Sequence, residues 1–187
     1  MKLFGIAGWS GAGKTTLIVK LISFFASRGI RVSTVKHAHH DFDIDQPGKD
    51  SFVHRKAGAT EVIVSSARRF ALIHELGADD PEMSLPQLLA RLSPCDLVLV
   101  EGFKTLTHPK LEVFRAANGR DALHPADPCI VAVASDQVFP QARIPVVPLD
   151  DVAAICELIL TKAISIDEAM AKLTDSLQNK GGVRQAS

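Results

Sequence analysis

The residues with the clearest chemical potential form the segment Gly8-Trp9-Ser10-Gly11-Ala12-Gly13-Lys14-Thr15. It matches without a mismatch the pattern G-x-x-x-x-G-K-[ST] of phosphate-binding loops. Its glycines permit backbone angles at which successive N–H groups point at phosphate oxygens. In such a loop the lysine, here Lys14, reaches the β- and γ-phosphates, and the hydroxyl of Thr15 is placed to ligate Mg²⁺. The segment therefore predicts a nucleoside-triphosphate site; the alternative is a Gly-rich turn with an exposed lysine.

Two elements must position this loop. The apolar run 3–7 predicts a buried strand that leads into it, and the spacing of apolar residues over 14–22 predicts a helix that leads out. This strand–loop–helix context is the one that the motif requires. A helix that begins at Lys14 adds unpaired backbone N–H groups and the positive end of its dipole at the same point.

Carboxylates that follow two other apolar runs are the next candidates. The run 95–101 has the features of a central strand and ends in Glu101, while Asp136 follows the apolar run 129–134. Because ligands bind outside the carboxyl ends of the strands in doubly wound sheets, we expect these loops to converge on the phosphate loop. Glu101 is the predicted Mg²⁺-side carboxylate, and Asp136 can accept hydrogen bonds from a guanine base. The segment 118–121 resembles the guanine motif N-K-x-D only superficially and is interpreted as a turn.

A polar loop over 37–50 is too long for a simple connection, and loops of this length are often functional. Asp45, with Asp43 as a substitute, is predicted to orient the attacking water or to bind the metal shell. Lys49 is a candidate for contacting a phosphate or the base. A solvated acidic loop with a surface lysine is the alternative. His37, His39 and His40 are weak evidence for a transition metal because no cysteine or fixed fourth ligand accompanies them.

The order of elements predicts an α/β fold of the P-loop NTPase type, with a mostly parallel sheet and helices on both faces. Runs 61–65 and 70–76 predict an antiparallel hairpin or an edge extension of the sheet. A short helix capped by Asp50 or Ser51 precedes them, and two helices, capped at Asp150 or Asp151 and at Ser165, close the fold. We expect one nucleotide-binding domain over 1–180 and a disordered tail over 181–187.

Composition narrows the class of protein. The 187 residues carry 21 basic and 21 acidic side chains, so the overall charge disfavours nucleic acid or an anionic membrane as partner. Cys95, Cys129 and Cys156 lie apart in apolar runs, which predicts reduced core thiols in a cytoplasmic protein. The apolar amino terminus is interrupted by Lys14 and occupied by the phosphate loop, so neither a signal peptide nor a membrane span is expected.

Four segments together resemble a known family. They are the phosphate loop with its second threonine, Thr16; the His-rich run 35–41 continuing to 45–51; the run 55–59; and Val100-Glu101-Gly102-Phe103-Lys104. Over about residues 2–160 the chain resembles the molybdopterin-guanine dinucleotide biosynthesis protein B family, MobB. The resemblance implies a GTP-binding accessory protein with weak, Mg²⁺-dependent GTPase activity. It also implies a homodimer that assists the guanylyltransferase that attaches GMP to molybdopterin.

By the same resemblance, the phosphates are held by Gly11, Ala12, Gly13, Lys14, Thr15 and Thr16, with Thr15 and Glu101 on Mg²⁺. The loop from Asp45 to Lys49 is expected near the γ-phosphate or a molybdopterin ligand. Some related loops carry a lysine where this chain has Trp9, so their cross-subunit lysine mechanism is not carried over. An alternative from another class is an ATP-dependent small-molecule kinase or ligase resembling dethiobiotin synthetase, which also combines a phosphate loop with a strand-terminal Glu-Gly.

Overall fold

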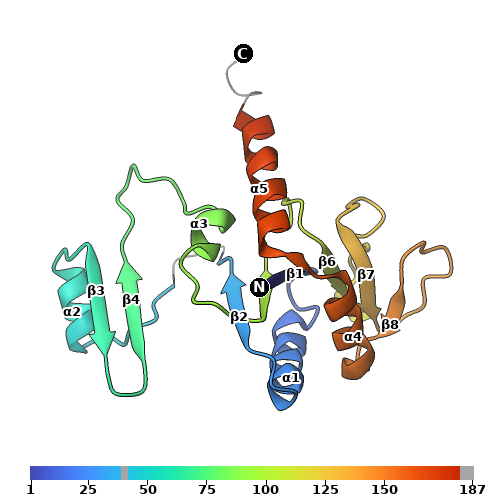
Figure 1. Cartoon of the computed structure of the whole chain (residues 1–187), viewed down its shortest axis with the longest axis horizontal. Helices are drawn as coiled ribbons and strands as arrows, with labels where there is room; N and C mark the ends of the chain where they lie inside the picture. Colours follow the sequence, from blue (N-terminus) through green and yellow to red (C-terminus); the bar gives the residue numbers. More distant parts are fainter. Residues whose placement is uncertain (39–41, 182–187) are drawn as a thin grey trace. The chain divides into compact units, whose positions relative to one another are not determined.

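The computed structural model describes residues 1–38 and 42–181, with side chains up to residue 175 in the last helix (Figure 1). The chain forms two compact units. The larger unit comprises Met1–His37 and Leu85–Ser187, and the smaller one comprises Ala38–Ser84.

A mostly parallel sheet forms the centre of the larger unit. Its described strands lie in the order β2-β5-β1-β6-β7-β8, all parallel, and a short β9 pairs antiparallel with β1. The central strand β1 is flanked by two strands from far along the sequence. The bounds are β1 Lys2–Ala7, β2 Val32–Lys36, β5 Leu97–Glu101, β6 Lys110–Phe114, β7 Ile130–Ser135, β8 Val146–Pro148 and β9 Ile164–Ser165. The predicted parallel sheet is confirmed, whereas β9 is too short to be recognised from its sequence.

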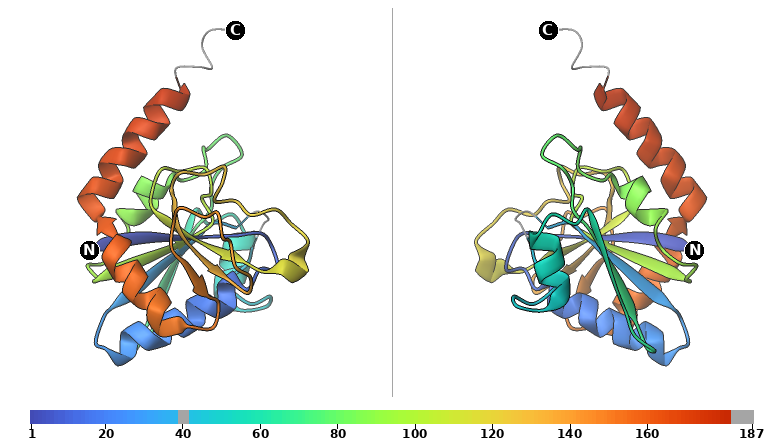
Figure 2. Two further views of the ribbon diagram at one scale, coloured as in Figure 1. Left: turned by 90° about the vertical axis from the view of Figure 1, so that its right-hand side faces the viewer. Right: turned by 90° about the vertical axis from the view of Figure 1, so that its left-hand side faces the viewer.

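Helices cover both faces of this sheet, as predicted (Figure 2). On one face α1 (Lys14–Ser27) packs against α4 (Val152–Lys162), and both contact the core around Phe4 and Ile6. On the other face α3 (Leu85–Leu89) and α5 (Ile166–Gly181) enclose the core around Leu3. Within the described residues, no helix combines the length and apolarity that crossing a membrane requires.

The expected helix caps are confirmed at two of three positions. The Asp151 carboxylate accepts a hydrogen bond from the N–H of Ala154 at the start of α4, and the Ser165 hydroxyl accepts one from the N–H of Glu168 at the start of α5. The cap expected at Asp50 or Ser51 is not observed. The helix concerned, α2 (Asp50–Lys56), already includes both residues, whereas a capping residue precedes the first residue of its helix. The residue at the N-cap position is Lys49, and its side chain makes no capping hydrogen bond. Asp50 lies in the first turn, where its negative charge interacts favourably with the helix dipole.

The smaller unit consists of α2 and a hairpin of β3 (Glu61–Ser65) and β4 (Phe70–His74). The two strands pair antiparallel along their whole length, from Glu61 opposite His74 to Ser65 opposite Phe70, which confirms the predicted hairpin. They form a separate two-stranded sheet. Of their side chains only Val62 is buried, so most of the apolar surface of the hairpin is exposed.

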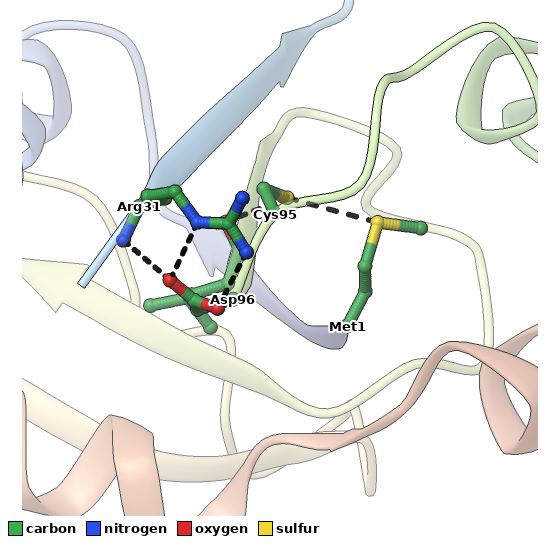
Figure 3. A network of polar contacts seen from close by, with 5 residues as sticks. Met1, Arg31, Cys95 and Asp96 are labelled. Carbon is green, nitrogen blue, oxygen red and sulfur yellow. Dashed lines mark hydrogen bonds and ion pairs between the residues drawn. The ribbon is translucent and has the colours of Figure 1, made fainter.

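The end of the large sheet opposite the phosphate loop is held by polar contacts before β2 and β5 (Figure 3). The Arg31 backbone N–H donates to Asp96 at 2.8 Å, and its guanidinium adds two hydrogen bonds at 3.1 Å. The hydrogen bonds from Arg31 lower the pKa of the Asp96 carboxyl. Nearby, the thiol of Cys95 lies 3.8 Å from the sulfur of Met1. These contacts fix the starts of two neighbouring parallel strands in register.

The three cysteines are free thiols, as predicted. Cys95 and Cys156 are buried, and burial raises the pKa of the Cys156 thiol to about 11. Cys129 is only half-buried because it lies just before β7 rather than within it, so its assignment to the core was wrong. Gly181, where the expected tail begins, is the last residue of α5, and residues 182–187 lie outside the described residues.

One buried polar side chain was not anticipated. His108 is fully buried beside Gly5, and neither of its ring nitrogens has a hydrogen-bond partner within the part of the chain that the structure describes. A Cβ on Gly5 would lie 2.5 Å from His108 Nε2, so the glycine provides the space that the imidazole occupies. The neighbouring Lys110 is also buried and donates to Asp127 at 2.8 Å and to the backbone oxygen of Lys104 at 2.7 Å.

Candidate functional site

The phosphate loop joins β1 to α1 at the carboxyl end of β1. Its glycines Gly8, Gly11 and Gly13 have φ angles of 140°, 80° and 94°, which L side chains rarely adopt. A Cβ on Gly8 would lie 2.5 Å from the backbone oxygen of Val113, so β6 approaches the loop closely enough to require glycine there. Gly13 occupies the N-cap position of α1, and no side chain makes a capping hydrogen bond there. The unpaired N–H groups of the first turn are thus left for a bound anion.

Lys14 and Glu101 come together at this loop. Glu101 is the last residue of β5 and lies in register with Ile6 of β1, directly beside the start of the loop. The Lys14 ammonium donates to the backbone oxygen of Trp9 at 3.0 Å. Partial burial lowers the pKa of Lys14, and Lys104 and Lys36 act in the same direction, whereas the negative charge of Glu101 raises it. A bound polyphosphate would favour the charged ammonium in the way that Glu101 does.

The residues after β5 are held in an unusual backbone conformation. Gly102 has a φ of 92°, and a Cβ there would lie 2.8 Å from the Cβ of His37. Phe103 has a φ of 49°, the one non-glycine residue in the left-handed region among those described, and its ring packs 4.8 Å from that of His37. Backbone strain of this kind concentrates at functional sites. The contacts therefore fix the segment that follows Glu101.

A second segment lies beside the phosphate loop, and we call residues 115–124 the flanking segment. The Asn118 amide donates to the backbone oxygen of Ser10 at 3.0 Å, and the Trp9 indole donates to the backbone oxygen of Asp121 at 2.9 Å. Asn118 ends a short 3₁₀ helix, Ala116–Asn118, and Gly119 follows with a φ of 57°. The interpretation of 118–121 as a turn is thus compatible with the backbone, but it missed the contact of Asn118 with the phosphate loop.

Asp136 follows β7, and one of its carboxylate oxygens accepts a hydrogen bond from the N–H of Ala116 at 2.9 Å. It therefore anchors the start of the flanking segment. The buried Glu112 anchors the other end, because its carboxylate accepts hydrogen bonds from the N–H groups of Leu123 at 2.6 Å and His124 at 2.9 Å. Recognition of guanine by Asp136 stays a prediction.

Asp45 and Lys49 belong to the smaller unit, where both line an open hollow formed with α2 and β3. The Asp45 carboxylate accepts hydrogen bonds from Arg55 at 2.7 and 3.3 Å, and the same guanidinium contacts Asp43 at 2.5 Å. Hydrogen bonding to Arg55 lowers the pKa of Asp45, so the carboxylate is ionised at neutral pH. Lys49 is exposed. The roles predicted for both residues at a nucleotide stay predictions.

The histidine loop is only partly described. His37 is the last residue of the first segment of the larger unit, while His39 and His40 lie outside the described residues. Among the residues that are described, no group of three or more His, Cys, Asp or Glu side chains could hold a metal ion. The magnesium ligands predicted here, the hydroxyl of Thr15 and the carboxylate of Glu101, are too few to form such a group. Two protein ligands are compatible with Mg²⁺, which retains several waters.

Comparison with known proteins decides the family. The profile of MobB, molybdopterin guanine dinucleotide synthesis protein B, matches residues 3–136. The chain belongs to the MobB family. The matched region contains the phosphate loop, Glu101, the polar loop and Asp136, so every candidate site residue lies within the family match.

Curated MobB relatives extend the match over most of the chain. The molybdopterin-guanine dinucleotide biosynthesis adapter protein of Escherichia coli K12 is 43% identical over 161 residues, covering 84% of this chain and 91% of the relative. The adapter protein of the same name in Haemophilus influenzae is 41% identical over 134 residues, covering 72% of this chain and 74% of the relative.

Solved MobB structures share the fold. A crystal structure of molybdopterin-guanine biosynthesis protein B superposes with a TM-score of 0.64 at 26% identity, covering 85% of this chain and 98% of the other. The crystal structure of Bacillus subtilis MobB superposes with a TM-score of 0.67 at 20% identity, covering 88% and 99%. The second likeness, at this low identity, concerns the fold alone.

Proposed function

We propose that this chain is a GTP-binding adapter with slow, Mg²⁺-dependent GTPase activity in the biosynthesis of molybdopterin guanine dinucleotide. The observation that carries the proposal is the phosphate loop, which is intact in sequence, has the required glycine conformations and brings Lys14 beside Glu101. The relatives that match most of the chain are named adapter proteins of this pathway. The free thiols accord with a cytoplasmic location.

In this proposal residues 1–180 act as one nucleotide-binding domain whose phosphate-holding residues all lie in the larger unit. The backbone N–H groups of Gly11, Ala12 and Gly13 and the first turn of α1, with Lys14 and Thr16, hold the phosphates. The Thr15 hydroxyl and Glu101, directly or through water, hold Mg²⁺, which neutralises phosphate charge. Asp136 faces the base. For Asp45, whose pKa is lowered by its hydrogen bond to Arg55, and for Lys49, the proposed role is to act on the γ-phosphate or on a molybdopterin ligand.

The experiment is a calorimetric titration of the purified protein with GTP and with ATP, in parallel, in Mg²⁺. We expect GTP to bind more tightly than ATP, because guanine offers the N1–H and the 2-amino group to a carboxylate. Hydrolysis should be slow. Absence of GTP binding would refute the proposal, and rapid product formation from ATP and a small acceptor would favour a kinase or ligase instead.

The same titration separates the contribution of the metal. In Glu101→Gln, which keeps the shape of the side chain and removes its charge, the Mg²⁺-dependent gain in GTP affinity should shrink by about tenfold. Affinity in EDTA should change less, because without the metal a carboxylate near phosphate is not favourable. Glu157→Gln, a charge change on the outer surface of α4, is the matched control. Equal losses with and without Mg²⁺ would contradict a metal-side role.

The exposed hairpin supports a homodimer. Isolated two-stranded hairpins are marginally stable, and each strand of this sheet has a single paired edge. Large apolar side chains on it are exposed, with Phe70 at 75% and Ile63 at 67% of their full accessibility. We propose that a second copy of the chain covers this surface. Sedimentation should give about twice the chain mass of 20.1 kDa, and Phe70→Asp should shift it towards the monomer. A wild-type mass of one chain at every concentration would contradict this.

A further inference from the structure

An arginine lies against the phosphate loop near its last glycine, Gly13. Arg115 directly follows β6, and a Cβ placed on Gly13 would lie 3.6 Å from its Nη2 and 3.9 Å from its Nε. Gly13 is the N-cap of α1 and immediately precedes Lys14. The guanidinium therefore lies at the residue whose backbone helps to surround the phosphates, in the same unit of the chain as the loop itself.

The backbone that carries Arg115 is fixed at four points. Asp136 holds the N–H of the next residue, Ala116, at 2.9 Å. Asn118 binds the backbone oxygen of Ser10, and the indole of Trp9 binds the backbone oxygen of Asp121. Glu112, fully buried, holds the far end of the flanking segment. Two of the four contacts are made by the phosphate loop itself, so the position of Arg115 is coupled to the position of the loop.

The charge of Arg115 is available to a ligand. Arg28, Arg31 and Arg55 each form an ion pair with a carboxylate. Arg115 is exposed, and within the described part of the chain no carboxylate forms an ion pair with it. A guanidinium is suited to phosphate oxygens because its planar N–H groups can bind two oxygens at once. A polyphosphate site requires cations beside the anion-binding loop. Arg115 supplies such a cation.

We propose that Arg115 binds the triphosphate in cis and stabilises the negative charge that develops during hydrolysis. The inference rests on the proposed function. In the reaction, the oxygen of a water molecule forms a bond to the γ-phosphorus while the bond from that phosphorus to the β–γ bridging oxygen breaks. The products are GDP, inorganic phosphate and a proton. Charge builds on the γ-phosphoryl and bridging oxygens, and a guanidinium contacting them lowers the barrier more than it strengthens ground-state binding.

The test compares Arg115→Ala and Arg115→Lys with the wild-type protein in single-turnover GTP hydrolysis at saturating protein and Mg²⁺. Arg91→Ala is the matched control, because it removes the same charge from an exposed position of the same unit, between α3 and β5. We expect Arg115→Ala to lower the rate constant at least about tenfold and to lower GDP affinity less. Arg115→Lys should recover part of the rate, and Arg91→Ala should stay within about threefold of the wild type.

Thermal unfolding of each variant, measured alongside, distinguishes a lost contact from a lost fold. A wild-type rate constant in Arg115→Ala, with the wild-type protein binding and hydrolysing GTP, would overturn this inference and leave the proposed function standing. Equal losses in Arg115→Ala and Arg91→Ala would also overturn it, because the effect would then follow from net charge. A wild-type protein that binds no GTP would overturn the proposed function itself.

Discussion

Replacing Lys14 with alanine is expected to lower the affinity for GTP at least about 100-fold. Lys14 opens α1 beside the phosphate loop, where its ammonium hydrogen-bonds to the backbone oxygen of Trp9. Each charge-assisted hydrogen bond to a phosphate oxygen contributes about 1.5–3 kcal/mol, and the lysine of such a loop reaches two phosphates. The loss should therefore exceed that of any other single substitution at the site.

The fold should tolerate this change, because Lys14 is not part of either apolar core. Lys20→Ala, on the exposed face of the same helix, is the control for charge and helix propensity. Calorimetric titration of both variants with GTP in Mg²⁺ makes the comparison, and the midpoint of thermal unfolding shows whether the fold is intact. An unchanged GTP affinity in Lys14→Ala would mean that the phosphates do not bind at this loop.

The buried imidazole of His108 is expected to make the protein less stable as the pH falls. Burial, reinforced by the charge of Lys110 and opposed by that of Asp127, lowers the pKa of His108 to about 4. The unfolded chain binds a proton near pH 6.5, so between pH 6.5 and about 4 it holds more protons than the folded chain. Above pH 6.5 the titration of the buried imidazole therefore costs no stability. As the pH falls from 6.5 towards 4, the free energy of unfolding decreases by about 3 kcal/mol in total.

Urea unfolding at pH 7 and pH 4 measures this effect against a variant without the imidazole. In His108→Leu the carboxylates still titrate, so the difference in unfolding free energy between variant and wild type isolates His108. That difference should shift by about 3 kcal/mol in favour of the variant at pH 4 relative to pH 7. A difference for His108→Leu that is the same at both pH values would contradict the assignment.

The elements that position the site could be read from local sequence. The phosphate loop, the apolar runs that became β1, β5 and β7, and the hairpin all have signals within a few consecutive residues. Glu101 was placed correctly beside the loop because a carboxylate at the end of a central parallel strand has few other positions open to it. The MobB resemblance rested on segments of the same local kind, and the family match confirmed it.

The contacts that could not be predicted from the sequence join residues that lie far apart along the chain. Asn118 binds Ser10 across 108 positions, and nothing near either residue indicates the pairing. The burial of Lys110 and Glu112 contradicts the usual preference of charged side chains for water, and it depends on partners in the loop that precedes β7. Such long-range compensation decides which polar groups a core accepts. One sequence considered by itself holds no record of these long-range pairings.

The position of β1 has a consequence for the order in which this protein can be made. Its neighbours β5 and β6 begin at Leu97 and Lys110, and its last partner β9 is Ile164–Ser165, which meets Leu3 and Lys2. A growing polypeptide that has emerged from the ribosome only as far as α1 therefore has the complete phosphate-loop motif but lacks every strand that pairs with β1. Acquisition of nucleotide affinity during translation should consequently come late and abruptly, after long-range strand pairing rather than when the motif itself appears.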